Sequence, residues 1–376
     1  MVSLFLLTFL STCLATLAFR QISRHSNVGH DLNSGVQKFH TQPTSRLGGL
    51  AIAIGLVTAW AVGNFVGSEL ASFLGSFLLA SLFVFAGGLV EDLTHKVSPA
   101  LRLFLALMSA SYCYWYLGIA VFRTDVALVD ALLALPGATF LVTLLVVAGF
   151  THSMNIIDGF HGLASGIALI MVSGLAYIAW SSHDELLLQL CILTFAAVLG
   201  FFVFNWPSGE VFLGDAGAYL LGFWIVGLGL LLVSRNPGVS PMAPVVVGIL
   251  PLFETLFSMY RRRFVRKHSI NHADSLHLHT LVYRRLLLNP AVDVSHRRIN
   301  AANAKVAVHF WLPSIVFAAL ACLFFDNTHA QLALIVAFGA LYVWLYKRVI
   351  RYNTPKWLMR RDVPRSSPLA SGNHVP

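Results

Sequence analysis

Charged residues are scarce in this sequence. Only 11% of its 376 residues are Asp, Glu, Lys or Arg, whereas 57% are hydrophobic. An ordinary soluble domain is about one quarter charged. This shortage excludes a soluble globular protein and predicts an integral membrane protein.

Cysteine is also rare. The four cysteines lie inside apolar runs and form no CxxC pair, which excludes a cysteine-based zinc or redox motif. We interpret them as small packing residues. The sequence also lacks a separate basic domain, because its Lys and Arg residues flank the apolar runs. That distribution argues against nucleic acid as a partner.

Long apolar runs dominate what is present. A helix needs about 20 apolar residues to cross the hydrocarbon core, and about eleven runs approach that length. They are 2–19, 48–66, 69–90, 99–119, 138–154, 163–181, 185–205, 216–234, 241–258, 307–325 and 331–347. Because a helix satisfies its own backbone polar groups in lipid, the sequence predicts an all-α polytopic membrane protein with about eleven transmembrane helices.

The distribution of positive charge predicts the topology. The first run is followed, not preceded, by basic residues, so we expect an uncleaved span with its N-terminus outside. If the spans alternate, every Lys and Arg except Arg123 and Arg235 falls on one side, which the positive-inside rule makes cytoplasmic. We therefore expect one membrane domain over 1–350, followed by a cytoplasmic tail over 351–376. Its cytoplasmic loops, expected to be catalytic, are 20–47, 91–98, 155–162, 206–215 and 259–306.

Asp215 stands between Gly214 and Gly217, where an apolar run begins. One interpretation is a helix N-cap, since Asp accepts hydrogen bonds from the first free backbone N–H groups. The other is a ligand for a divalent metal, with the glycines letting a phosphate approach the backbone at the positive end of a helix.

A second polar stretch is NIIDGFHGLASG, residues 155–166. Asn155, Asp158 and His161 follow one another at intervals of three, so a helical turn would put them on one side. The glycines between them leave the backbone open to a ligand. Asp158 could instead cap the next helix, and His161 could be an ordinary polar loop residue.

Two further stretches border apolar runs. Glu91 and Asp92 are adjacent, and such carboxylates repel unless a metal or another cation relieves them; Lys96 follows. A solvated surface cluster would have the same sequence. Arg46 precedes a Gly-Gly helix entry and offers two parallel donors to a phosphate, or it is simply one more cytoplasmic positive charge.

The basic loop contains His272, His277 and His279. Zinc would need a fourth ligand that the spacing does not supply. Histidine and arginine donate charge-assisted hydrogen bonds to phosphate, so a nucleotide-diphosphate pocket is the simpler interpretation. A loop that binds lipid headgroups is the alternative. Taken together, these carboxylates, glycines, arginines and histidines are the set needed for Mg²⁺-dependent phosphoryl transfer.

Five segments, in order, resemble one family: the polyprenyl-phosphate N-acetylhexosamine-1-phosphate transferases of glycosyltransferase family 4, which start the lipid carriers of peptidoglycan, O-antigen and teichoic acid. HTQPTSRLGG is similar to the entry motif, EDLTHK to the paired-acid motif and SMNIIDGFHGLASG to the Asn…Asp-Gly motif. FNWPSGEVFLGDAGAYLLGF resembles the Phe-x-Gly-Asp-x-Gly motif. PLFETLFSMYRRR with HLHT resembles the last cytoplasmic segment.

The resemblance implies an enzyme of the bacterial inner membrane with its active site facing the cytoplasm. It implies transfer of a sugar-1-phosphate from a UDP-sugar to polyprenyl phosphate, with release of UMP, as the start of cell-surface polysaccharide synthesis. Asp215 would hold Mg²⁺, for which Mn²⁺ could substitute, and Glu91 and Asp92 would lie beside the attacking lipid phosphate. Asn155 and Asp158 would bind the diphosphate or the uridine. The other expected contacts are Arg46, Lys96, His161, His277 and His279. Whether the chain forms a homodimer stays open.

Several positions depart from the family pattern. Glu91 and His161 stand where aspartates are usual, which leaves open whether Glu91 acts as a base. His152 and Thr280 replace a usual Asn and His. These departures favour an O-antigen or exopolysaccharide type over the peptidoglycan branch. The alternatives are a secondary transporter, whose nearest interior charge would be Glu254, and a catalytically silent relative.

Overall fold

The described part of the chain is almost entirely helical. The computed structural model describes residues 1–25, 30–31, 44–266, 276–287 and 296–351. Within them the strands are two short antiparallel segments, β1 (His30–Asp31) and β2 (Thr44–Ser45). The predicted all-α class is confirmed. Residues 352–376 of the expected tail, together with Lys38, His40 and His272, lie outside the described ranges.

The helices follow the apolar runs closely. They are α1 (Val2–His25), α2 (Gly48–Phe65), α3 (Glu69–Thr94), α4 (Pro99–Leu117), α5 (Ala127–Leu133), α6 (Ala138–Ile157), α7 (Leu163–Ser181), α8 (Glu185–Asn205), α9 (Gly214–Arg235), α10 (Met242–Val247), α11 (Ile249–Tyr260), α12 (Leu278–Val282), α13 (His296–Leu323) and α14 (Thr328–Ile350). Two π-helical turns, η1 (Arg261–Arg266) and η2 (Tyr283–Leu287), extend α11 and α12.

Nine of these helices are long and apolar enough to cross a membrane, counting only described residues. The expectation of about eleven spans differs at two runs. The run 99–119 forms α4, a helix of 19 residues that is less apolar than the nine and carries Arg102 near its start. The run 241–258 is divided into α10 and α11 at Gly248.

Prolines explain the division. Pro251 has no N–H to donate to Val247 and its ring disfavours a continuous helix through this point. At Gly248 the backbone passes so close to Phe150 that an added Cβ would lie 2.7 Å from its ring. Hydropathy does not register a missing backbone donor, so the apolar run 241–258 gave no sign of the break at Gly248.

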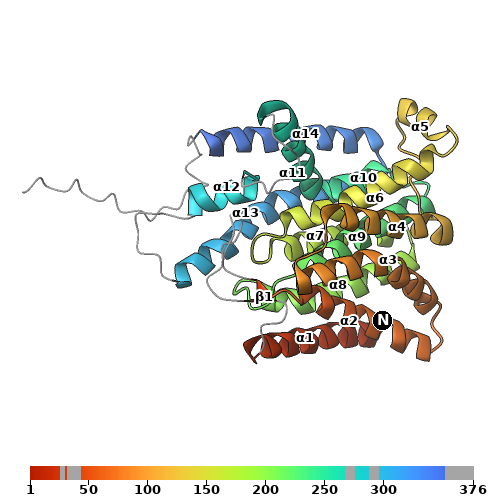
Figure 1. The fold of residues 1–376 in the computed structure, drawn as a ribbon. Helices are drawn as coiled ribbons and strands as arrows, with labels where there is room; N and C mark the ends of the chain where they lie inside the picture. Colours follow the sequence, from red (N-terminus) through yellow and green to blue (C-terminus); the bar gives the residue numbers. More distant parts are fainter. Residues whose placement is uncertain (26–29, 32–43, 267–275, 288–295, 352–376) are drawn as a thin grey trace, which may run out of the picture.

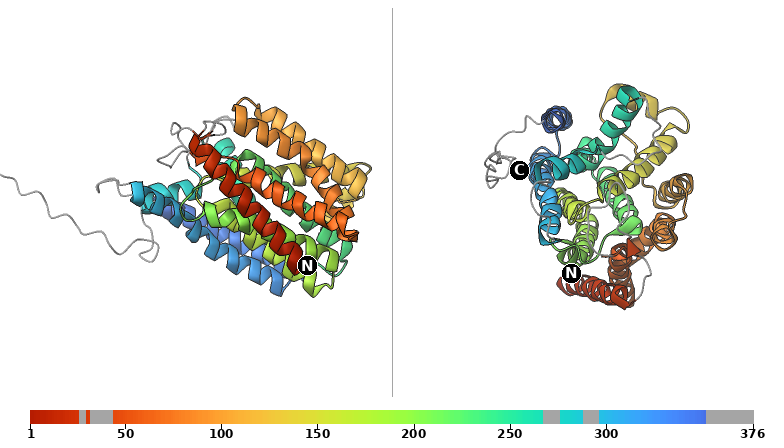
Figure 2. Two further views of the ribbon diagram at one scale, coloured as in Figure 1. Left: turned by 90° about the horizontal axis from the view of Figure 1, so that it is seen from below. Right: turned by 60° about the vertical axis from the view of Figure 1, so that its left-hand side comes forward.

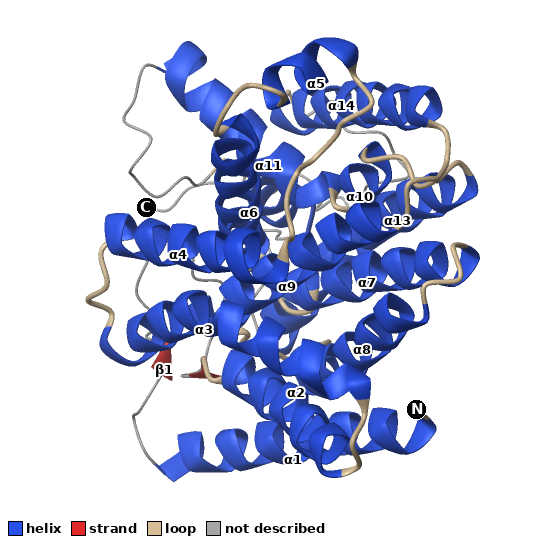
Figure 3. Ribbon diagram, turned by 90° about the vertical axis from the view of Figure 1, so that its right-hand side faces the viewer, coloured by secondary structure: helices blue, strands red, loops and turns tan. Residues whose placement is uncertain are grey.

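The helices pack side by side around α9 (Figures 1 and 2). Nearly all residues of α9 are buried, and α3, α6, α2 and α7 contact it from different sides. On one flank α1 packs against α2 and α8, while α13 and α14 cover α7, α10 and α11 on the other (Figure 3). A helix enclosed this completely gives its first residues a fixed position.

Gly49 of α2, Gly88 of α3 and Gly217 of α9 allow close packing at the start of α9. A Cβ on Gly49 would lie 2.1 Å from the backbone nitrogen of Gly217, and a Cβ on Gly88 would lie 2.5 Å from Cα of Ala216. Backbone atoms cannot rotate away as side chains can, so both positions require glycine. α2 and α3 therefore approach the first turn of α9 more closely than larger residues would permit.

The bundle has two polar ends. α12 and the strands lie at one end, with the C-terminal end of α14, whereas α5 and the N-terminus lie at the other (Figure 1). At the α5 end, Arg235 contacts Asp184 at 2.7 and 2.9 Å, and Arg123 contacts Asp125 at 2.7 Å. Arg123 and Arg235 are the two basic residues that the alternation of spans separates from the rest.

At the α5 end, several hydrogen-bond donors stabilise the ionised carboxylate of Asp184. Burial opposes its ionisation, but hydrogen bonds from Arg235, Leu187 and Asn236 outweigh that effect and keep the pKa of this carboxyl below its usual value. The contacts therefore stabilise the fold above the carboxyl's ordinary pKa, and this contribution is lost as the pH falls through the lowered value.

We predict that Gly88→Ala destabilises the protein by about 1–3 kcal/mol, the usual cost of overpacking. Gly149→Ala is the matched control, because Gly149 lies in α6 with nothing within 4 Å of an added Cβ. That change should be neutral or stabilise by up to about 1 kcal/mol. Thermal unfolding of the detergent-purified variants measures both, and equal midpoints for the two would contradict the close packing at α9.

Candidate active site

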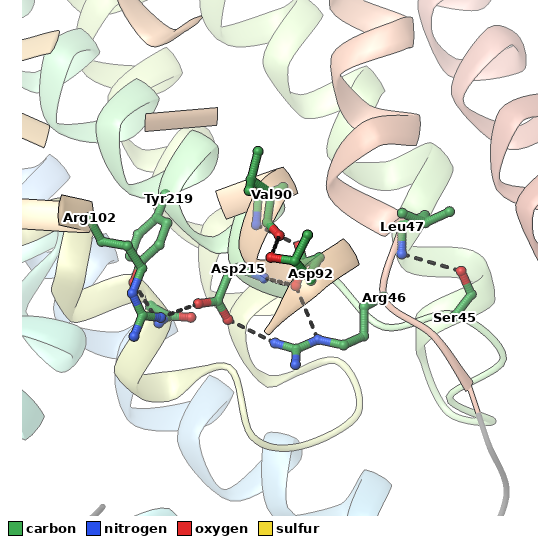
Figure 4. A network of polar contacts seen from close by, with 11 residues as sticks. Ser45, Arg46, Leu47, Val90, Asp92, Arg102, Asp215 and Tyr219 are labelled. Atoms are coloured by element: carbon green, nitrogen blue, oxygen red, sulfur yellow. Dashed lines mark hydrogen bonds and ion pairs between the residues drawn. The ribbon is translucent and has the colours of Figure 1, made fainter. Parts of the chain in front are cut away.

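Four charged side chains meet at the start of α9 (Figure 4). Asp215 Oδ1 accepts from Arg46 Nη2 at 2.8 Å, and Asp215 Oδ2 accepts from Arg102 Nη1 at 2.6 Å. Arg46 Nε also lies 3.1 Å from Oδ1 of Asp92. We call Arg46, Asp92, Arg102 and Asp215 the charge quartet. Its members come from the segment before α2, the end of α3, and the starts of α4 and α9, and their charges balance.

Asp92 caps α9 from another helix. Its carboxylate oxygens accept the backbone N–H groups of Asp215 and Ala216, each at 2.9 Å, and the side chain is fully buried. The N-cap position of α9 is Leu213, which has no side-chain acceptor. The N-cap interpretation of Asp215 is therefore wrong: Asp92 takes the capping role and leaves the Asp215 side chain to the arginines.

The site suits a magnesium ion held partly by substrate. Carboxylate oxygens are the ligands that Mg²⁺ and Mn²⁺ prefer, and the two carboxylates of the charge quartet share Arg46. No group of three His, Cys, Asp or Glu residues that could hold a metal occurs among the described residues. Mg²⁺ commonly takes only one or two carboxylates and completes its shell with phosphates and water. The donor set fits such an ion. Asp215 is the better placed ligand, because its oxygens contact arginine side chains, which can rotate away, whereas those of Asp92 accept backbone N–H groups, which cannot.

The adjacent acids of α3 point to different partners. Glu91 is half-buried, and its Oε2 accepts the backbone N–H of Val97 at 2.8 Å. Lys96 lies on the surface. Glu91 and Lys96 are not members of the charge quartet, but Glu91 lies near enough to Arg102 for the two charges to interact.

The last turn of α6 contacts α9 next to the charge quartet. Asn155 Nδ2 donates to the hydroxyl of Tyr219 at 3.1 Å, and Tyr219 follows Asp215 by one turn of α9. Asp158 is the half-buried C-cap residue of α6. It does not cap α7: the N-cap there is Gly162, whose N–H donates to Asn205 Oδ1 at 2.8 Å.

His161 is built into the protein interior. It is 3% exposed, its backbone N–H donates to Asn303 Oδ1 at 2.7 Å, and its Nδ1 lies 3.3 Å from the carbonyl of Pro207. Its ring also faces Phe212, with centroids 5.6 Å apart. His161 therefore ties the α6–α7 loop to the segment before α9 and to α13.

The two histidines of the last motif share one carboxylate. Glu254 of α11 lies 3.3 Å from Nδ1 of His277 and 3.2 Å from Nδ1 of His279, and all three side chains are buried. Phe160 packs edge-on against His279, with ring centroids 5.7 Å apart. This second cluster therefore lies against the α6–α7 loop, which follows the turn of α6 whose Asn155 contacts Tyr219 of α9.

Sequence reasoning missed several residues of the site. Arg102 had been counted only as a cytoplasmic positive charge, although its place in the first turn of a helix after the acid pair was an available signal. Glu254 was considered only as the charge of a transporter. The buried amides of Asn205 and Asn303, which accept from Gly162 and His161, gave no signal because each needs a partner far away in sequence.

Comparisons with known proteins identify the family of this chain. A family model described as "Glycosyl transferase family 4" matches residues 74–233, which include Asp92, Arg102 and Asp215. A Bacillus subtilis protein named "Probable undecaprenyl-phosphate N-acetylglucosaminyl 1-phosphate transferase" is 31% identical over 69% of this chain and 70% of its own length.

Two further relatives cover more of the chain. A "Decaprenyl-phosphate N-acetylglucosaminephosphotransferase" of Mycolicibacterium smegmatis is 27% identical over 79% of this chain and 76% of its own. A "Phospho-N-acetylmuramoyl-pentapeptide-transferase" of Geobacillus thermodenitrificans is 25% identical over 83% of this chain and 94% of its own. The resemblance noted in the sequence is therefore confirmed, and the chain belongs to glycosyl transferase family 4.

Proposed function

We propose that this protein transfers an N-acetylhexosamine-1-phosphate from a UDP-sugar to polyprenyl phosphate, forming polyprenyl-diphospho-sugar and UMP. The reaction starts the synthesis of a cell-surface polysaccharide. The observation that carries the proposal is the charge quartet, in which two buried acids meet two half-buried arginines at the positive end of a helix. The named activities of the relatives supply the substrate classes.

In this reaction an oxygen of the polyprenyl phosphate attacks the β-phosphorus of the UDP-sugar. A new P–O bond forms, the bond to the bridging oxygen breaks, and UMP leaves with that electron pair. Catalysis of this kind depends on positioning the phosphates and neutralising their charge. Arg46 and Arg102 would donate to phosphate oxygens, because guanidinium groups match their geometry.

Asp215 would hold Mg²⁺, which when bound withdraws negative charge from the diphosphate oxygens. Asp92 would position Asp215 by fixing the first turn of α9, since its oxygens are already engaged by N–H groups. Asn155 and Asp158 would contact the diphosphate or the uridine, while His161 would hold the α6–α7 loop from the protein interior. His277 and His279 would contact phosphate or sugar. Glu91 and Lys96 would lie toward the lipid phosphate.

The site would face the cytoplasm of a bacterial inner membrane. The end of the bundle that holds the charge quartet also holds the basic ends of α1, α11 and α14, and the positive-inside rule assigns such an end to the cytoplasm. The N-terminus would then lie outside and the C-terminus inside.

The position of Glu254 does not favour a transporter. Transport sites usually lie near the middle of the membrane in broken helices, and α11 does follow a break. Yet the acid of α11, Glu254, contacts His277 and His279, which lie beside α12 at one end of the bundle.

One assay distinguishes a transferase from a transporter and from a silent relative. A transferase should move radiolabelled sugar into a butanol-soluble lipid and release UMP. Repeating the assay with a panel of UDP-N-acetylhexosamines identifies the donor.

We predict that Asp215→Asn, which keeps the side chain's shape but removes its charge, reduces transfer to background in membranes supplied with Mg²⁺. Asp184→Asn is the matched control, because Asp184 is also a buried, arginine-paired acid but lies at the opposite end. Its transfer per folded molecule should match the wild type. UMP release by Asp215→Asn at a near-normal rate would contradict the metal assignment.

We expect removal of divalent metal to stop the reaction reversibly. EDTA should reduce transfer to background, and Mg²⁺ or Mn²⁺ added in excess should restore it, because both prefer the oxygen ligands present here. Transfer that persists in EDTA at saturating UDP-sugar would refute the requirement for a metal.

Arg102→Gln should lower kcat/KM by about 100-fold or more, since it removes a charged donor aimed at the phosphates. Arg123→Gln, which removes an arginine from the opposite end, should have little effect on transfer. Equal activity of the two variants would show that Arg102 only stabilises the fold.

A further inference from the structure

Glu254 contacts two histidines through its two carboxylate oxygens, and it also interacts with the hydroxyl of Tyr342. Oε2 faces Nδ1 of His277 at 3.3 Å and Oε1 faces Nδ1 of His279 at 3.2 Å. The two rings are stacked, with centroids 5.2 Å apart and planes inclined by only 5°. Glu254 is 1% exposed, so water does not compete for its oxygens.

This geometry fixes which ring nitrogen carries hydrogen. An ionised carboxylate only accepts hydrogen bonds, so each Nδ1 facing it must be the donor. Nε2 is then the ring nitrogen that does not face Glu254; it accepts when the ring is neutral and donates when it is protonated. Because each Nδ1 faces the same carboxylate, both Nε2 atoms lie on the sides of the rings away from it.

The Nε2 edge of His279 faces the α6–α7 loop. A Cβ placed on Gly159 would lie 3.9 Å from that nitrogen, and the ring of Phe160 packs against the same imidazole. Gly159 follows Asp158, the C-cap residue of α6, and Asn155 in the last turn of α6 donates to Tyr219, one turn after Asp215 in α9. The histidine pair therefore faces a loop whose preceding helix contacts α9 next to the charge quartet.

Side chains from η1 and α14 hold the backbone just before the two histidines. Arg261 and the hydroxyl of Tyr346 both donate to the carbonyl of Leu276, the residue before His277. The backbone N–H of His279 also points to Glu254 Oε1 at 3.4 Å. The segment therefore meets α11 and α14 through polar contacts and keeps its imidazole edges on the other side.

We infer that Glu254 is a positioning residue for transfer. It holds His277 and His279 with hydrogen on Nδ1 and so directs their Nε2 atoms away from α11. With the sugar-nucleotide bound, a protonated histidine of the pair would donate from Nε2 to a phosphate oxygen, and a charge-assisted hydrogen bond of this kind is strong. This inference rests on the proposed function and gives the otherwise unexplained acid of α11 a role.

The test compares two substitutions of Glu254 in the purified full-length protein. Glu254→Gln keeps the shape but leaves one acceptor oxygen for two Nδ1–H groups and removes the charge. Its kcat/KM for the UDP-sugar should fall about 10- to 100-fold, the range found when the partner that orients a metal-bound histidine is lost. Glu254→Asp retains the charge and should recover part of the loss. Asp184→Asn is the control for loss of a buried, paired acid.

A double-mutant cycle separates positioning from general stability. If Glu254 acts through the histidines, adding Glu254→Gln to the His277→Ala/His279→Ala variant should cause no further loss of kcat/KM. A second loss of about tenfold would overturn the inference, as would full activity of Glu254→Gln alone. Each variant is compared per folded molecule after size-exclusion chromatography.

A measurement without turnover keeps the inference distinct from the proposed function. Solid-state NMR of ¹⁵N-histidine-labelled protein in lipid, with peaks assigned by His277→Asn and His279→Asn, should show hydrogen on both Nδ1 atoms. Glu254→Gln should change this for at least one ring. Bare Nδ1 atoms in the wild type would overturn the inference. The predicted tautomers in a protein that transfers no sugar-phosphate from any UDP-sugar would instead refute the proposed function.

Discussion

The site depends on the compensation of buried charge at the first turn of α9. Asp92 is fully buried and could not be ionised there without donors. Two backbone N–H groups of α9 and the guanidinium of Arg46 supply them. The same contacts fix where α9 begins, and so where Asp215 stands. Structure and charge are therefore set together, because moving either acid would leave the other, or an arginine, without its partner.

The glycines let the helices approach one another closely enough for these contacts to form. Gly49 and Gly88 bring α2 and α3 against the backbone of α9, and Asp92 lies one turn after Gly88. An acid on a helix at ordinary packing distance could not reach backbone N–H groups of its neighbour so directly. The glycine-bordered motifs in the sequence thus serve helix packing as well as access for a ligand. Neither use excludes the other.

The sequence was sufficient for the helical class, most of the spans and the grouping of polar loops. Apolar length and alternation are local properties, and they place α2 to α4 and α6 to α9 within a few residues, whereas α1 is longer than its apolar run and α5 was not predicted. The break at Gly248 was missed because it depends on backbone donors and on Phe150, which is distant in the chain. The partners of Asp92 and Glu254 were missed for the same reason. Local sequence shows that an acid is buried, but only the fold shows which groups neutralise it.

The central claim is that a divalent ion at Asp215 and the two arginines gather the sugar diphosphate at the start of α9. Electron–nuclear double resonance of Mn²⁺ bound to the purified protein with a UDP-N-acetylhexosamine tests it directly. The account predicts ³¹P couplings from the diphosphate together with ¹³C couplings from labelled aspartate, with the ¹³C couplings lost in Asp215→Asn. Phosphate couplings alone, unchanged by that substitution, would mean that the ion is carried by the nucleotide and that the protein's acids do not hold it.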